Sequence, residues 1–131
     1  MEQQRSSDFS NLLLDLAYFR ESPRIKWTDV KKNSNGSFQL SYPIYGEEVY
    51  RLMDSFAAGN FACRDYLRRT ESLNSDSKEE TAAFIATANI DDLLALLTLY
   101  IRGERFCDGM IAGAIESGTI GAILLRIREL T

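Results

Sequence analysis

One segment of the chain is apolar around its whole circumference, and this feature limits the fold more than any other. Six leucine or isoleucine residues follow Ile90 within three turns, Leu93, Leu94, Leu96, Leu97, Leu99 and Ile101. A helix that is apolar on every side has to be covered by other elements on most sides. Asn89 is placed to cap its N-terminus, with Asp91 and Asp92 in the first turn. The sequence therefore predicts a central helix from Ile90 to Arg102.

Helical periodicity recurs on both sides of this segment. Apolar residues at three- and four-residue spacing predict further helices over about 8–22, 47–58, 61–69, 78–88, 110–117 and 119–130. Ser77 and Glu80 form a capping box that opens one of them. Gly59 is placed as the residue that ends another helix, and Gly118 separates the last two. These signals favour a mainly helical protein.

The period changes between Ile25 and Ile44. Ile25 and Trp27 alternate with polar residues, residues 33–36 supply an Asn-Gly turn, and a second alternating set follows, Phe38, Leu40, Tyr42 and Ile44. This pattern predicts a β-hairpin. Because a lone hairpin is barely stable in water, we expect its apolar face to pack on the helices. The predicted fold class is α+β, mainly helical, with about five or six helices and one short β-hairpin packed against them, in a single domain over 1–131.

Composition excludes several kinds of chemistry. The chain has no histidine, so Ser-His-Asp or Cys-His catalysis and histidine metal ligands are absent. Cys63 and Cys107 lack metal-site spacing, and no motif predicts a cofactor. Residues 1–8 lack an apolar signal region, and no apolar run approaches the ~20 residues of a membrane span. We therefore expect a cytoplasmic protein without cofactor or metal.

Charged residues gather in one short segment, 102–109, and at Glu116. Arg102 and Arg105 could bind an anion as guanidinium forks, with Asp108 and Glu116 as orienting partners. The favoured interpretation is an arginine-carboxylate network that only joins helix ends. Asp108 and Glu116 are eight residues apart, roughly two helical turns, which is a wide spacing for a pair of catalytic carboxylates. The segment is therefore a candidate ligand site and a weak candidate for catalysis.

A second basic segment runs from Arg20 to Lys32 and contains Trp27. Basic and aromatic residues together are typical of nucleic-acid surfaces. The formal net charge of the whole chain is -4, however, which disfavours direct nucleic-acid binding. The favoured interpretation of the segment is a hairpin with Trp27 packed inward and solvated lysines. Arg64, Arg68 and Arg69 are likewise expected on the solvated face of a helix.

The C-terminal third resembles a family of small uncharacterised bacterial proteins. The residues that carry the resemblance are Ala88–Leu93, Leu96–Thr98, the run Arg102-Gly103-Glu104-Arg105-Phe106-Cys107-Asp108-Gly109, and Glu116-Ser117-Gly118. Tyr42–Tyr45, before a Glu-Val-Tyr-Arg helix, is similar as well. Many members have histidines where this chain has Met110 and Thr119. The resemblance implies a compact single domain of bacterial or mobile-element origin, and it implies no activity.

Three hypotheses for the function follow. The first is a non-enzymatic protein-interaction or regulatory module, including a homodimer formed through the apolar C-terminal helices. The second is a small-ligand or anion pocket, with or without enzymatic activity, built from Arg102, Arg105, Asp108 and Glu116. The third is a mobile-element-encoded adaptor or inhibitor of a host defence system. The first is favoured because the chain lacks a recognisable catalytic apparatus.

Overall fold

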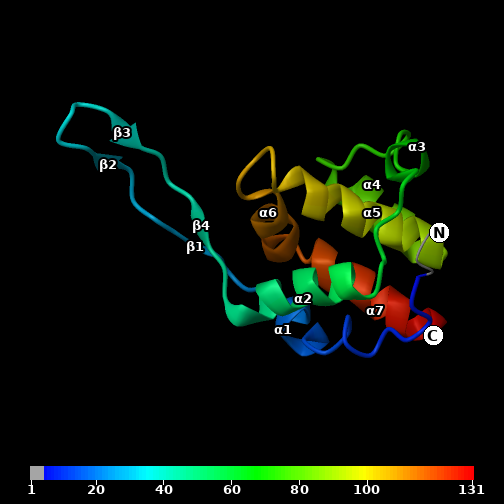
Figure 1. Cartoon of the computed structure of the whole chain (residues 1–131). Coiled ribbons are helices and arrows are strands. Elements are labelled where there is room, and N and C mark those ends of the chain that lie inside the picture. Colours follow the sequence, from blue (N-terminus) through cyan, green and yellow to red (C-terminus); the bar gives the residue numbers. More distant parts are fainter. Residues whose placement is uncertain (1–4) are drawn as a thin grey trace.

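The computed structural model describes residues 5–131, which form a body of helices and a β-ribbon that projects from it (Figure 1). The described residues contain seven helices, α1 (Leu16–Arg20), α2 (Glu47–Ala58), α3 (Tyr66–Arg69), α4 (Lys78–Thr87), α5 (Ile90–Gly103), α6 (Met110–Glu116) and α7 (Thr119–Leu130). This number exceeds the expected five or six, although each of the seven corresponds to a segment with predicted helical periodicity. The predicted α+β, mainly helical fold class is confirmed.

Helix α5 lies at the centre of the body, as predicted. It contacts α3, α6 and α7, and its leucines Leu93, Leu94, Leu96 and Leu97 are fully buried. The Asn89 side chain accepts a hydrogen bond from the N–H of Asp92 at 2.9 Å, so the predicted N-cap is confirmed. Ser77 caps α4 in the same way by accepting from the N–H of Glu80 at 3.2 Å.

Helix α7 is the second structural centre. It contacts α1, α4, α5 and α6, and four of its apolar side chains are fully buried, Ile120, Ile123, Leu124 and Ile127. Helix α1 approaches it so closely that a Cβ on Gly121 would lie 2.5 Å from the carbonyl oxygen of Phe19. The apolar C-terminal helices are thus largely packed inside the body, and the homodimer expected through them stays a prediction.

Two local expectations differ from the structure. The first predicted helix is shorter, because residues 10–15 form turns before α1 begins, although Phe9 and Leu12 are buried as expected. Gly59 has a right-handed conformation, and the left-handed residue after α2 is Asn60, with φ of 55°. Glycine is still required at Gly59, since a Cβ there would lie 2.2 Å from the ring of Phe61. Gly118, with φ of 85°, separates α6 from α7 as predicted.

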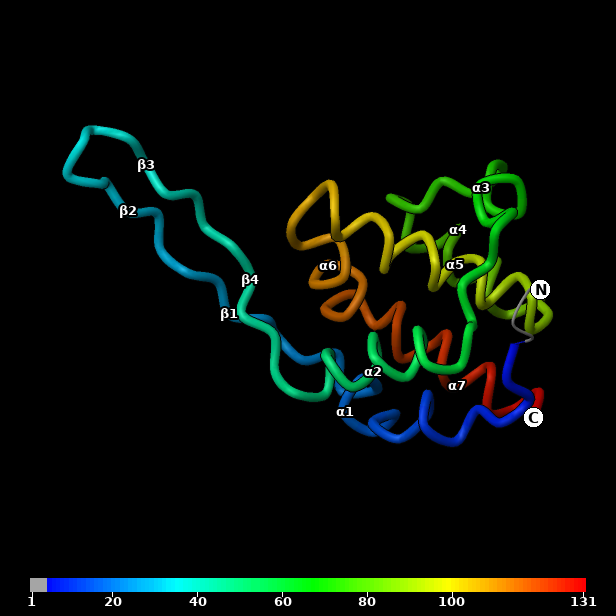
Figure 2. The backbone as a smooth tube through the Cα atoms, in the orientation of Figure 1, coloured from blue at the N-terminus to red at the C-terminus, as the bar shows by residue number. Residues whose placement is uncertain are grey.

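The hairpin is the element that differs most from expectation. Its strands are β1 (Lys26–Trp27), β2 (Lys31–Lys32), β3 (Phe38–Gln39) and β4 (Pro43–Ile44), with β1 paired to β4 and β2 to β3. The tube in Figure 2 shows that the two paired strands leave the body together and turn back far from it. Only the base of the hairpin contacts the helices. The expectation that its whole apolar face packs on the helices is therefore wrong for the outer part.

No single helix among residues 5–131 is long and apolar enough to cross a membrane. Helices α6 and α7 reach the length and apolar composition of a membrane span only when taken together, and the chain bends by 71° between them.

Candidate interaction surface

The four residues proposed as a ligand site are dispersed over three places in the fold. Arg102 stacks on the ring of Tyr66, with 5.5 Å between the guanidinium carbon and the ring centre. Glu116 accepts a hydrogen bond from the backbone N–H of Ile25 at 2.8 Å. Arg105 and Asp108 lie on the exposed turn between α5 and α6. Among residues 5–131, none of the hydrogen bonds or ion pairs joins two of the four, so the anion pocket stays a prediction.

Glu104 organises this region instead. Its carboxylate accepts hydrogen bonds from the N–H of Gly109 at 3.1 Å and of Ile111 at 2.9 Å, which cap the first turn of α6. It also accepts from the Tyr45 hydroxyl at 2.8 Å, and Tyr45 lies between the hairpin and α2. Burial raises the pKa of Tyr45 above its usual range, and the hydrogen bond to Glu104 raises it further. One carboxylate thus joins α5, α6 and the base of the hairpin.

Two further contacts hold the base of the hairpin on the same segment. Gly109 has φ of 93°, and a Cβ on it would lie 2.4 Å from the Trp27 ring, so the indole rests directly on this glycine. The hydrogen bond from the Ile25 N–H to the Glu116 carboxylate holds the residue just before β1 on the same segment. The segment from Arg102 to Glu116 therefore holds the base of the hairpin against the helical body. Sequence reasoning missed this role because nothing local to Glu104 indicates partners at positions 45 and 111.

The hairpin, here called the arm (residues 26–44), is one ribbon with a single register. Lys26 pairs with Ile44 and Lys32 with Phe38. In both pairs the residue numbers add up to the same total, so the register continues unchanged between them. Between the two ladders the Thr28 N–H donates to the Tyr42 carbonyl at 2.9 Å. Residues 28–30 and 40–42, between the two ladders, are not in strand; we continue the register and the alternation of the ladders through them to assign the side chains of the arm to two faces.

The two faces have opposite characters. One face, here called the apolar face, carries Phe38 and Ile44 from the two ladders. Continued alternation assigns Val30, Leu40 and Tyr42 to the same face. Lys26, Thr28 and Lys32 occupy the remaining positions of this face. The opposite face carries Trp27, Asp29, Lys31, Asn33, Ser37, Gln39, Ser41 and Pro43. The arm is thus an amphipathic β-ribbon.

The apolar face is bare. Exposed fractions of its five apolar residues range from 45% at Tyr42 to 77% at Leu40. Large apolar side chains have full areas of about 150–250 Å², so the row exposes on the order of 500 Å², at the upper end of what monomeric proteins leave uncovered. Trp27, which contacts the body at Gly109, belongs to the opposite face, so at the base of the arm the apolar face is turned away from that contact. The chain's own helices therefore leave this face uncovered.

Charge also separates the arm from the rest of the chain. The arm has three lysines and one aspartate, a net charge of +2, which leaves -6 for the remaining residues. The lysines at positions 31 and 32 lie toward the tip of the arm, next to the turn. Glu47 and Glu48 open α2 directly after the base of the arm. The arm is basic at its tip and borders acidic residues at its base.

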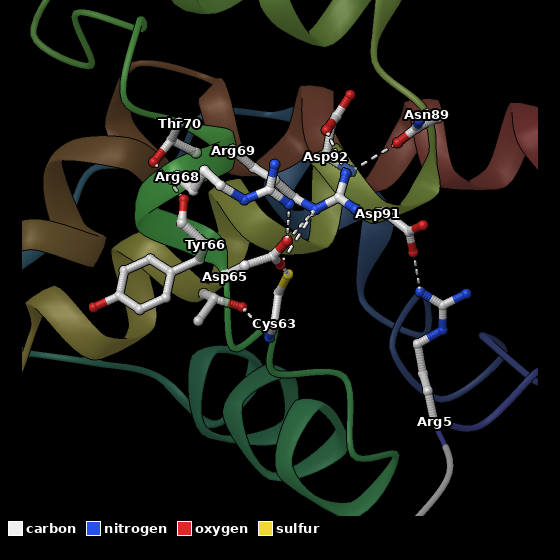
Figure 3. A network of polar contacts seen from close by, with 11 residues as sticks. Arg5, Cys63, Asp65, Tyr66, Arg68, Arg69, Thr70, Asn89, Asp91 and Asp92 are labelled. Carbon is white, nitrogen blue, oxygen red and sulfur yellow. Dashed lines mark hydrogen bonds and ion pairs between the residues drawn. The ribbon is translucent and has the colours of Figure 1, made fainter.

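A separate polar network joins α3 to the first turn of α5 (Figure 3). Asp65 lies at its centre, where it accepts from the Cys63 thiol at 2.8 Å and forms ion pairs with Arg68 and Arg69. Arg69 continues the network to Asp92, with 3.1 Å between nitrogen and oxygen. Arg69 is therefore tied into the structure more than a solvated helix face predicts, whereas Arg68 is exposed as expected.

The electrostatics of this network indicate a structural role. The thiol hydrogen bond and the arginines hold the pKa of Asp65 well below its usual range. Burial raises the pKa of the Cys63 thiol, and the adjacent carboxylate raises it further. A protonated thiol is a poor nucleophile, so Cys63 lacks the activation that a catalytic cysteine needs. Both cysteines are free thiols.

One hollow lies beside the arm's base, between α4, α5 and α6. It encloses about 320 Å³ and is rich in hydroxyl groups, which come from Ser75, Thr81, Tyr100, Ser117 and Thr119. Ser117 and Thr119 pair with each other at 2.9 Å, and Thr81 donates to the Ser77 carbonyl at 2.8 Å. None of the four predicted ligand residues lines this hollow. Residues 5–131 also hold no group of three side chains suited to a metal ion.

The helical body and its projecting ribbon define a mainly helical α+β protein that carries a β-arm. The chain belongs to a family described as "Family of unknown function (DUF6508)", which matches residues 4–131. The match covers almost the whole chain and therefore more than the C-terminal third in which a family resemblance was noted. Neither a curated protein nor a solved structure matches the chain.

Proposed function

We propose that the protein is a non-enzymatic interaction module that docks on another protein molecule through the apolar face of its arm. The exposed row of five apolar side chains on a projecting ribbon carries this proposal. Contiguous apolar patches of this size mark interaction sites, and a two-stranded ribbon needs further packing to be stable on its own. Docking would supply that packing.

The composition of the arm supports a protein partner over a nucleic acid. Nucleic-acid affinity comes mainly from phosphate contacts made by clustered basic residues. The apolar face has two lysines, at its opposite ends, and five apolar residues between them. The chain as a whole is acidic. The free thiols of Cys63 and Cys107 are consistent with the reducing cytoplasm.

A pair of adjacent substitutions tests the proposal. Leu40→Ser removes the most exposed apolar side chain of the arm, and Gln39→Ser changes its neighbour on the opposite face. Both residues are exposed, so both variants should keep the wild-type unfolding midpoint. Tagged wild-type protein and both variants would be used as baits in nuclease-treated lysate of the native host, with mass spectrometry as the readout.

We expect partners that the wild type and Gln39→Ser capture equally and that Leu40→Ser loses. Partners captured equally by all three baits would refute the arm as the docking element. Partners that disappear after nuclease treatment would favour a nucleic-acid adaptor instead.

A further inference from the structure

We infer that the hollow between α4, α5 and α6 binds a small molecule through a primary ammonium group of that molecule. This inference goes beyond the proposed function, because none of the residues on the apolar face of the arm lines the hollow. Three observations carry it, namely the buried hydroxyl groups in the walls, the hydrogen bonds that already use their protons, and the carboxylate at the edge.

Buried hydroxyl groups are concentrated in the walls of the hollow. Thr81, Tyr100 and Thr119 are all buried, and all three line it. Of the four buried threonines among residues 5–131, two therefore lie at this one place. Met110 and Ala114 add an apolar part to the wall. The volume of about 320 Å³ lies at the lower end of the range for small-molecule sites, so the hollow suits a small polar molecule with a short apolar part.

The protein itself already uses the protons of these hydroxyl groups. The Thr81 hydroxyl donates to the Ser77 carbonyl at 2.8 Å, and the Ser117 hydroxyl donates to the Ala114 carbonyl at 3.2 Å. Because the Ser117 proton is used there, we assign the donor of the 2.9 Å contact between Ser117 and Thr119 to Thr119. These three hydroxyl groups therefore offer a ligand lone pairs and no proton. A ligand that binds them has to bring its own N–H or O–H groups.

Asp76 supplies the negative charge that an ammonium group needs. Burial raises the pKa of Tyr100, and the nearby Asp76 carboxylate raises it further, so the phenol stays neutral beside a negative charge. An ammonium group carries three N–H donors, and its hydrogen bonds to a carboxylate are about twice as strong as those between neutral groups. The residues outside the arm also carry a net charge of -6, which favours a cation over an anion.

Lys78 separates two kinds of ammonium compound. Its exposed side chain lines the same hollow, where it can bind a carboxylate of the ligand. An amino acid would use both Asp76 and Lys78, whereas a simple amine would use Asp76 alone. The ammonium group is the chemistry that both share, and the experiment distinguishes the two.

Titration of the purified, nitrogen-15-labelled full chain with propylamine hydrochloride tests the inference by NMR. Gly109 and Gly113 line the hollow, so their backbone amide signals should shift and reach saturation. Tetramethylammonium chloride is the matched probe, because it has the same charge and no N–H donor, and it should bind at least about tenfold more weakly. Signals that do not saturate with propylamine up to about 20 mM overturn the inference. Equal Kd values for the two probes also overturn it.

A pair of charge-removing variants tests the role of the carboxylate. Asp76→Asn keeps the size of the side chain and removes its charge, and both residues of the pair are exposed, so the fold should be kept. Glu79→Gln is the control, because it makes the same change on α4 outside the hollow. We expect Asp76→Asn to raise the Kd for propylamine by about tenfold or more and Glu79→Gln to leave it unchanged. Equal Kd values for the two variants overturn the assignment.

Two further probes identify the class of ligand. Alanine that binds more tightly than propylamine, with the difference removed by Lys78→Met, supports an amino acid as the ligand. Alanine that binds more weakly than propylamine supports a simple amine. Inorganic phosphate that saturates the Gly109 and Gly113 signals, while propylamine leaves them in place, overturns the inference and makes the hollow an anion site.

Discussion

Removal of the Glu104 carboxylate should destabilise the protein more than any other exposed-turn substitution in the segment 102–109. Glu104→Ala leaves the N–H groups of Gly109 and Ile111 without their acceptor and removes the partner of the Tyr45 hydroxyl. Loss of a helix cap costs about 1 kcal/mol. A hydrogen bond to a charged acceptor contributes about 1.5–3 kcal/mol. We therefore expect a loss of about 3 kcal/mol in the free energy of unfolding.

Urea denaturation followed by circular dichroism measures this loss. With a denaturant slope of about 1.5 kcal/mol per molar, the midpoint should fall by about 2 M. Arg105→Ala is the matched control, because Arg105 is exposed and adjacent to Glu104. Its free energy of unfolding should change by less than about 0.5 kcal/mol. Equal midpoints for Glu104→Ala and Arg105→Ala would refute the assignment of Glu104 as the residue that joins α5, α6 and the arm.

The same variant makes a separate prediction at alkaline pH. The pKa of Tyr45 is raised in the folded state, so the phenol stabilises the fold below its unfolded pKa of about 10, and this contribution is lost as the pH rises through the higher folded pKa. In Glu104→Ala the hydrogen bond that is the second-largest cause of the raised Tyr45 pKa is absent. The stability of the wild type should therefore fall more steeply above about pH 10 than that of Glu104→Ala. Parallel curves would contradict the hydrogen bond.

Three further predictions follow from the same structure. Gly109→Ala places a Cβ against Trp27 at a left-handed position, so it should cost more than about 1 kcal/mol and alter the fluorescence of this single tryptophan, and an unaltered emission spectrum would contradict the contact. Asp65 has a lowered pKa, so its contribution to stability is present above about pH 4 and is lost as the pH falls through the folded pKa. The difference in melting temperature between the wild type and Asp65→Asn should therefore shrink below about pH 4. A constant difference would contradict the ion pairs. Cys107 is exposed whereas burial raises the pKa of Cys63, so Ellman's reagent should modify Cys107 first, with Cys107→Ser removing the fast phase; a fast phase that survives this substitution would contradict the assignment.

Elements governed by local signals could be predicted from the sequence. The caps at Ser77 and Asn89, the turn at Gly118 and the buried leucines of α5 all follow from residues within one or two turns of one another. The hairpin was predictable for the same reason, since alternation and an Asn-Gly turn are local. Local patterns therefore defined the elements well.

The placement of the hairpin depended on contacts that are distant in the sequence. Trp27 meets Gly109, Ile25 meets Glu116 and Tyr45 meets Glu104, and each pair is separated by more than fifty residues. Alternation alone shows that the ribbon has an apolar face, and it cannot show whether that face is covered. The segment 102–109 was interpreted as an arginine-carboxylate network joining helix ends or as a ligand site, and the ligand site stays a prediction. Its described contacts show that it also supports the arm.

The way the arm leaves the body makes it a detachable part. Lys26 and Ile44 are directly paired, so the two strands leave the body about 5 Å apart. A two-residue Asn-Gly turn can bridge such a gap, and a shortened chain could therefore keep Trp27 on Gly109 while lacking residues 29–41. The distance between the paired residues Lys26 and Ile44 equals the distance between the two strands that flank an exposed hairpin turn in another protein. The arm could accordingly be grafted onto an unrelated scaffold, which would show whether docking needs the arm alone or the helical body as well.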